Sequence, residues 1–148
     1  VVTRTFSKAY ALAGLRLGYA LCSSEEITNA LRLTTSTFNL SGIAEAAAIA
    51  AMKDQGYTQF ILDENTREMN RIKKGCRELG LNYMDSVTNF ISIDTGMENS
   101  SVVKSLRDRG VRVSTPGYDA TGTYIRASTG LSEDTDAFLA ALELVLSQ

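Results

Sequence analysis

A lysine, two hydroxyl residues and an arginine lie close together near the start of this sequence. Lys8 follows Thr5 and Ser7, and Arg16 comes eight residues later in a glycine-punctuated segment. A primary amine can form an imine with an aldehyde, whereas hydroxyls and a guanidinium can bind a phosphate dianion. This combination suits pyridoxal phosphate, an aldehyde that carries a phosphate group.

Each of the first three side chains also has an ordinary explanation. A lysine near a turn is most often a solvated surface charge, and Thr5 and Ser7 could serve only as strand and turn hydroxyls. The apolar segments on both sides of Lys8 are expected to bury it in part, which would favour the uncharged, nucleophilic amine. Thr5 and Ser7 are two apart in an extended segment and are therefore predicted to point to the same side.

Two arginines are candidates for binding anionic groups. Arg16 lies between Gly14 and Gly18, where a tight backbone bend is expected to aim its planar guanidinium inward at a phosphate. The alternative is a surface arginine at a turn. Arg126 is expected on one face of a strand over residues 123–128. There it would clamp the carboxylate of an amino acid, and the alternative is a solvated strand face.

Composition excludes several other kinds of function. The chain has 148 residues, with 15 basic and 17 acidic side chains and no histidine. No basic stripe is visible, so a nucleic-acid partner is not expected, and a Ser-His-Asp or Cys-His mechanism cannot be built from this chain. Cys22 and Cys76 form no zinc-binding or disulfide pattern, which favours a reduced, cytoplasmic setting. No apolar run approaches the ~20 residues that span a membrane.

The first part of the chain is predicted to contain two strands and then three helices. Strands over residues 1–6 and 17–22 flank the lysine segment, and a capping-box pattern at Ser23 to Glu26 precedes a helix ending near Leu33. An alanine-rich helix is expected after Ser41, and the longest helix over residues 57–79. Its buried stripe is predicted to hold Met69, Ile72, Cys76 and Leu79, and its solvent side the pairs Asp63–Arg67 and Glu68–Arg71.

The second part alternates between strands and helices. After Gly80, which is expected to end the long helix, strands are predicted over residues 89–94, 111–113 and 123–128. A helix over residues 100–109 ends at Gly110, and a final helix is capped by Ser132. This last helix is expected to turn Phe138, Leu142 and Val145 inward. The pattern predicts an α/β chain that ends in a small α+β unit.

The stretch from Ser7 to Tyr19 (SKAYALAGLRLGY) resembles the lysine motif of fold-type I, class II aminotransferases. It is most similar to that of histidinol-phosphate aminotransferases. The likeness continues through Asn89-Phe90 and through the segments 106–111 and 125–130, so it covers essentially the whole chain.

The resemblance implies roles for the candidate residues. Lys8 is the lysine that forms the Schiff base with pyridoxal phosphate and shuttles a proton at the substrate Cα. Thr5, Ser7 and Arg16 match positions that hold the cofactor phosphate, and Arg126 matches the arginine that binds the substrate α-carboxylate. One position departs from the pattern. The family often has an arginine where this chain has Ser114, and Arg112 stands two residues earlier, which leaves the exact substrate open.

The resemblance also implies an organisation and partners. Residues 1–55 would be the C-terminal part of the cofactor-binding large domain, with a mixed sheet and helices. Residues 56–80 would be a long connecting helix, and residues 81–148 the small C-terminal α+β domain. The large-domain residues that contact the cofactor ring normally precede the lysine motif, so this chain is expected to be a C-terminal half that is inactive alone. The substrates would be amino acids and 2-oxo acids, and the intact enzyme a homodimer.

Two other functions compete with transamination. Threonine-phosphate decarboxylases resemble the same motif, and they differ in losing CO₂ instead of a proton at Cα. A non-catalytic fragment or interaction module, binding phosphate or a partner without turnover, is the alternative from a different class.

Overall fold

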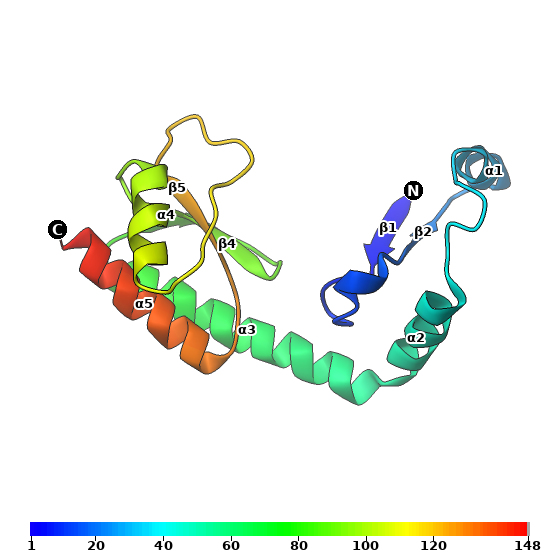
Figure 1. Ribbon diagram of the computed structural model, residues 1–148, viewed down its shortest axis with the longest axis horizontal. Helices are drawn as coiled ribbons and strands as arrows, with labels where there is room; N and C mark the ends of the chain where they lie inside the picture. The colour runs from blue at the N-terminus through cyan, green and yellow to red at the C-terminus, as the bar shows by residue number, and fades with distance from the viewer. Residues whose placement is uncertain (148) are drawn as a thin grey trace. The chain divides into compact units, whose positions relative to one another are not determined.

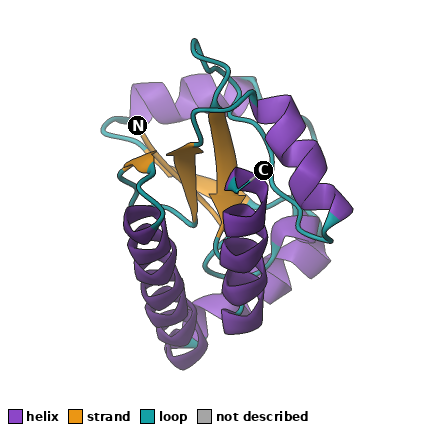
Figure 2. Ribbon diagram, turned by 90° about the vertical axis from the view of Figure 1, so that its left-hand side faces the viewer, coloured by secondary structure: helices purple, strands orange, loops and turns teal. Residues whose placement is uncertain are grey.

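The computed structural model describes residues 1–147. Helices make up most of the regular structure, and two small antiparallel sheets complete it (Figures 1 and 2). The expected α/β class is confirmed. Contacts divide the chain into two compact units, Val1–Leu62 and Asp63–Gln148, and the division lies inside the longest helix, α3 (Gln55–Glu78). Within the described residues, no helix combines the length and the apolar content needed to cross a membrane.

The first unit begins with the two predicted strands. β1 (Val2–Thr5) and β2 (Gly18–Leu21) pair antiparallel, with Thr5 opposite Gly18. The segment between them contains Lys8 and a short 3-10 helix, η1 (Ala13–Leu15). The lysine segment is therefore the connection of a two-stranded hairpin, and both of its ends are fixed by strand pairing.

Two helices follow the hairpin, and each begins at a serine cap. α1 (Glu25–Leu33) starts after Ser24, whose hydroxyl accepts the backbone N–H of Ile27. The predicted helix is confirmed, although the cap is Ser24 and not Ser23 of the expected capping box. α2 (Gly42–Lys53) starts after Ser41, as predicted, and this hydroxyl accepts the backbone N–H of Ala44. Such caps satisfy backbone donors that have no partner inside the helix.

The second unit contains a three-stranded antiparallel sheet. Its order is β3 (Asn82–Met84), β4 (Phe90–Asp94) and β5 (Tyr124–Ser128). Strands β4 and β5 were predicted, whereas β3 was not. The predicted strand over residues 111–113 is wrong. The N–H of Val111 is donated to the carbonyl of Leu106 and closes helix α4 (Asn99–Asp108), so the segment only reaches the sheet through a single bridge from Ser114 to Arg126.

Three helices pack on one face of this sheet. Helix α3, helix α4 and helix α5 (Ser132–Leu146) contribute to one core together with alternating residues of β4 and β5 (Figure 1). The predicted stripe of α3 is confirmed, because Met69, Ile72 and Cys76 are buried and Leu79 packs against the same core. The inward residues predicted for α5 are buried as well, namely Phe138, Leu142 and Val145.

Two glycines shape helix α3. Gly80 has a left-handed φ of 70° and ends the helix as predicted, with Leu81 donating its N–H to the carbonyl of Cys76. Gly75 lies inside the helix, where an added Cβ would stand only 2.5 Å from a methyl group of Leu139 in α5. The absence of a side chain at Gly75 therefore lets α3 and α5 approach closely.

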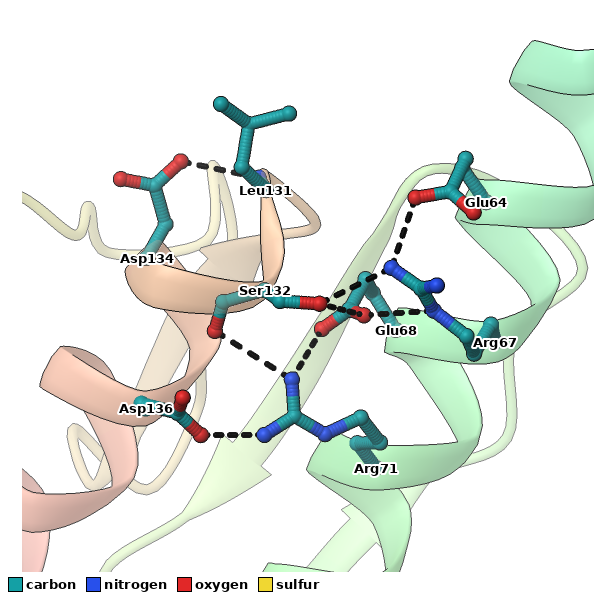
Figure 3. Close-up of polar contacts among 8 residues, drawn as sticks. All are labelled: Glu64, Arg67, Glu68, Arg71, Leu131, Ser132, Asp134 and Asp136. Atoms are coloured by element: carbon teal, nitrogen blue, oxygen red, sulfur yellow. Dashed lines mark hydrogen bonds and ion pairs between the residues drawn. The ribbon is translucent and has the colours of Figure 1, made fainter.

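Glu68 is buried, contrary to the prediction that it faces solvent with Arg71. Its side chain is fully covered, and its carboxylate accepts hydrogen bonds from Arg67 (3.0 Å), Arg71 (2.8 Å) and the hydroxyl of Ser132 (2.9 Å), as Figure 3 shows. Arg71 also pairs with Asp136 of α5. The physical reason is tertiary: the start of α5 packs over this turn of α3 and supplies a polar partner that the sequence places 64 residues away.

The same contacts correct the prediction for Ser132. This residue is the first of α5 and bonds across to α3, whereas the N-terminal cap comes from Asp134, which accepts the N–H of Leu131 at 2.9 Å. Burial alone would raise the pKa of the Glu68 carboxyl. The Thr135 hydroxyl, which faces it without full hydrogen-bond geometry, and the bonds from Ser132 and the two arginines outweigh burial and lower this pKa to about 2.

Candidate functional site around Lys8

The hydroxyls of Thr5 and Ser7 meet at the end of β1. The Thr5 Oγ1 donates to the Ser7 Oγ at 2.9 Å and accepts the backbone N–H of Ser7 at 3.1 Å. The predicted common orientation of the two hydroxyls is therefore confirmed. Because Thr5 uses its own proton in this pair, the hydroxyl proton of Ser7 stays available for an external acceptor.

Lys8 follows directly and begins a turn. Its carbonyl accepts the N–H of Ala11 at 2.8 Å, and its side chain is exposed. The expected partial burial of Lys8 is thus not observed, because among the apolar residues that flank it only Phe6 is buried. Among residues 1–147 the amine makes no hydrogen bond or ion pair. It is free to react with a ligand.

Arg16 takes up the bend of the connection itself. Its backbone is left-handed, with φ 53° and ψ 48°, while Gly14 has an ordinary φ and no atom near an added Cβ. The expectation that flanking glycines make the bend is therefore wrong at Gly14. One terminal nitrogen of Arg16 donates to the carbonyl of Ala13 at 2.7 Å. This leaves most of its five N–H donors for an anion.

Gly18 lets the two strands approach closely and does not bend the chain. An added Cβ there would lie 2.7 Å from the backbone oxygen of Arg4, so only glycine permits this close approach of β1 and β2. Gly18 is paired with Thr5 and follows Arg16 by two residues. The tight pairing therefore fixes the two ends of the connection, next to which the hydroxyl pair and the arginine lie.

The charge of this segment is one-sided. Residues 1–24 contain Arg4, Lys8 and Arg16 but no aspartate or glutamate, although the whole chain has more acidic than basic residues. This segment has no carboxylates, and some of its hydroxyl, guanidinium and ammonium donors are not used in hydrogen bonds among the described residues. Such a set of donors suits a phosphate. The residues present therefore fit the phosphate and the aldehyde of pyridoxal phosphate.

Arg126 lies in the second unit. It occupies the centre of β5, where Ile125 and Ala127 are buried and Arg126 is exposed, so the predicted alternation is confirmed. Its guanidinium carbon lies 5.2 Å from the centre of the Phe90 ring on β4. Ser114 bonds its backbone in both directions, with distances of 3.1 and 2.6 Å. The strand position is thus fixed, and the charged group is accessible to a carboxylate.

Sequence reasoning missed an aromatic cluster beside the lysine. The ring of Phe6 lies 4.8 Å from that of Tyr10 and 6.0 Å from that of Tyr19, centre to centre. Three aromatic residues within the first nineteen were a visible signal, because the whole chain has only five phenylalanines, six tyrosines and no tryptophan. Their convergence depends on the hairpin pairing, which brings Tyr19 across from β1.

Comparison with known proteins identifies relatives over almost the whole chain. Residues 1–142 match the family model described as aminotransferase class I and II. A histidinol-phosphate aminotransferase of Methylococcus capsulatus is 39% identical over 146 residues, which is 99% of this chain and 39% of that protein. The chain therefore spans about two fifths of the length of the curated relatives that it matches.

Solved structures agree with this likeness. The histidinol-phosphate aminotransferase of Sinorhizobium meliloti, solved in complex with pyridoxal-5′-phosphate, superimposes with a TM-score of 0.83 at 35% identity, over 98% of this chain and 40% of that one. An L-threonine-O-3-phosphate decarboxylase from Porphyromonas gingivalis superimposes with a TM-score of 0.80 at 22% identity, over 99% of this chain and 46% of that one. At this lower identity the second likeness concerns the fold alone.

Proposed function

The chain belongs to the class I and II aminotransferase family, and on that premise we propose that it forms part of a pyridoxal-phosphate-dependent aminotransferase. The whole protein, meaning this chain within a polypeptide of its relatives' length, would transfer the amino group of an amino acid or of histidinol phosphate to a 2-oxo acid. The observation that carries the proposal is the unpaired Lys8 amine beside the hydroxyl pair of Thr5 and Ser7.

Lys8 is proposed as the catalytic residue. Pyridoxal phosphate, when bound, supplies an electron sink for the bond that breaks at the substrate Cα. The Lys8 amine would hold the cofactor at its aldehyde carbon. Once the substrate amine had displaced it, the free amine could take the proton from the substrate Cα and return it as general acid. Its position after β1 supports this role, because a nucleophile on a rigid hairpin is held in a fixed place.

Three side chains are proposed to hold the phosphate. Ser7 donates its free hydroxyl proton, Thr5 orients that hydroxyl, and Arg16 offers a planar pair of N–H groups to two phosphate oxygens. Together they anchor the cofactor at the end opposite to its reacting carbon. Arg126 is proposed to bind the α-carboxylate of the substrate, for which its accessible guanidinium on a fixed strand is suited.

The organisation and setting of the whole protein are part of the same proposal. We assign residues 1–55 to the cofactor-binding large domain, residues 56–80 to a connecting helix and residues 81–148 to the small domain. A homodimer and a cytoplasmic location are proposed from the family. Both cysteines are free, Cys76 being buried and Cys22 half-buried, as a reducing compartment would allow.

A product assay tests the proposed reaction. The whole protein with pyridoxal phosphate is given histidinol phosphate and 2-oxoglutarate, and glutamate is measured; threonine phosphate is supplied in parallel and CO₂ is measured. We expect glutamate from the wild-type protein and none from Lys8→Ala. Release of CO₂ without glutamate would instead support the decarboxylase, and neither product from any amino donor would support the non-catalytic alternative.

A further inference from the structure

We propose that Phe6, Tyr10 and Tyr19 are positioning residues that fix the direction of the Lys8 amine. This inference rests on the proposed function of Lys8 and adds the group through which the fold controls it. The Lys8 side chain makes no hydrogen bond or ion pair among residues 1–147, so its own contacts do not orient it. The main chain that carries Lys8 must therefore set its direction.

Phe6 holds this part of the main chain in place. Its side chain is only 4% exposed, and it is the one large apolar residue that is buried in the described part of the first unit. Its N–H donates to the carbonyl of Leu17 at 3.1 Å, and its carbonyl accepts the N–H of Leu12 at 2.9 Å. Phe6, the first residue of the connection that contains Lys8, is thus bonded to its middle and to its last residue.

The rings of the two tyrosines connect Phe6 to the turn and to β2. Tyr10 lies inside the turn that Lys8 begins, between Lys8 and Ala11, and its ring contacts the Phe6 ring at 4.8 Å with a tilt of 36°. Tyr19 comes from β2 and approaches the same ring at 6.0 Å with a tilt of 58°. Tilted rings at these separations attract each other beyond their burial.

The turn needs such support because its backbone is strained. Ala11, the residue that closes the turn, has a φ of 55°, a left-handed conformation that is unfavourable for a residue with a Cβ. The backbone hydrogen bond from Ala11 to Lys8 closes the turn, and the ring contact of Tyr10 joins the turn to Phe6, the residue that follows β1. Removing the Tyr10 ring would therefore release the segment that points Lys8 toward its ligand.

The test uses ring deletions in the whole protein with pyridoxal phosphate bound. Tyr10→Ala and Tyr19→Ala delete the rings, whereas Tyr10→Phe and Tyr19→Phe remove only the hydroxyls. Tyr118→Ala is the matched control, because Tyr118 is 88% exposed in the second unit. Three quantities are measured per bound cofactor: kcat, the KM for the amino donor, and the pH midpoint of the visible absorption band of the cofactor.

We expect Tyr10→Ala to lower kcat by up to about 100-fold, the loss that a misplacement of about 1 Å can cause. The band midpoint should shift and the KM should stay close to that of the wild type, and both phenylalanine variants and Tyr118→Ala should behave as the wild type does. An unchanged kcat and midpoint in both alanine variants would overturn the inference, as would equal losses in Tyr10→Phe. A failure of the proposed function would be distinguishable from a failure of this inference, because the wild-type protein itself would then hold no cofactor on Lys8.

Discussion

Replacement of Gly18 by alanine tests whether the close approach of β1 and β2 builds the phosphate site. The new Cβ would stand 2.7 Å from the backbone oxygen of Arg4 and 3.7 Å from the Cα of Thr5. Neither neighbour is the flexible end of a side chain, so the strands themselves must separate. Thr5 is the residue paired with Gly18, and Arg16 precedes Gly18 by two residues, so their donors would move apart with the strands.

The expected loss of cofactor affinity in Gly18→Ala follows from the free energy needed to separate the two strands. Overpacking a tight site costs about 1–3 kcal/mol. If the bound state requires the close pairing, the affinity of the whole protein for pyridoxal phosphate should fall by roughly 5- to 150-fold, since about 1.4 kcal/mol corresponds to a factor of ten. Equilibrium dialysis of the purified protein against the cofactor measures this affinity directly.

Gly14→Ala is the matched control in the same connection. An added Cβ there meets no atom within 4 Å, and the backbone is not left-handed. The affinity should stay at the wild-type level, and the stability should be unchanged or raised by about 0.4–1 kcal/mol. Wild-type cofactor affinity in Gly18→Ala would refute the reasoning. An equal loss in Gly14→Ala would also refute it, because the loss could then not come from contact with Arg4.

The second unit supports two further predictions. The folded pKa of Glu68 is lowered from 4.5 to about 2, so its stabilisation is complete above pH ~4.5 and is lost as the pH falls toward 2. Because solvent screens its exposed partners Arg67 and Arg71, Glu68→Gln should destabilise the chain by only about 1–2 kcal/mol at neutral pH. In urea titrations this difference should vanish near pH 2. A difference that does not depend on pH would contradict this. Gly75→Ala should lower the free energy of unfolding by about 1–3 kcal/mol through its clash with Leu139, and by less in a Leu139→Ala background; additive effects in this double-mutant cycle would argue against the clash.

Local signals in the sequence predicted much of the fold. Ser41 and Gly80 mark helix ends through bonds to their own neighbours in the chain, so their roles could be inferred from residue type and position. The alternation of Ile125, Arg126 and Ala127 likewise reflects the period of two of any half-buried strand. Such features need no knowledge of distant partners.

Features that depend on distant partners could not be predicted in this way. Glu68 has the pattern of a solvent-facing i,i+3 pair, and only the docking of Ser132 covers it. The strand β3 has three residues, too few for a recognisable alternation, and it exists because β4 pairs with it. Val111 belongs to a strand-like run, but its N–H donates to the carbonyl of Leu106 at the end of α4 and not to a neighbouring strand.

The same distinction between local signals and distant partners applies to the candidate site. Residue types and spacing identified Lys8, Thr5, Ser7 and Arg16, because the chemistry of an amine beside phosphate ligands is local. The left-handed conformation of Arg16 was not visible, since arginine has no preference for it and the hairpin imposes it. The roles of these residues toward a cofactor stay predictions, supported by the free donors that the structure places at the end of β1.

Reductive trapping tests the central claim most directly. The whole protein is incubated with pyridoxal phosphate, reduced with borohydride and digested with trypsin, and the labelled peptide is identified by mass. Modification blocks cleavage at Lys8, so the account predicts one labelled peptide over residues 5–16, bounded by Arg4 and Arg16. A label on any other lysine, or no label in a protein that binds the cofactor, would contradict the assignment of Lys8.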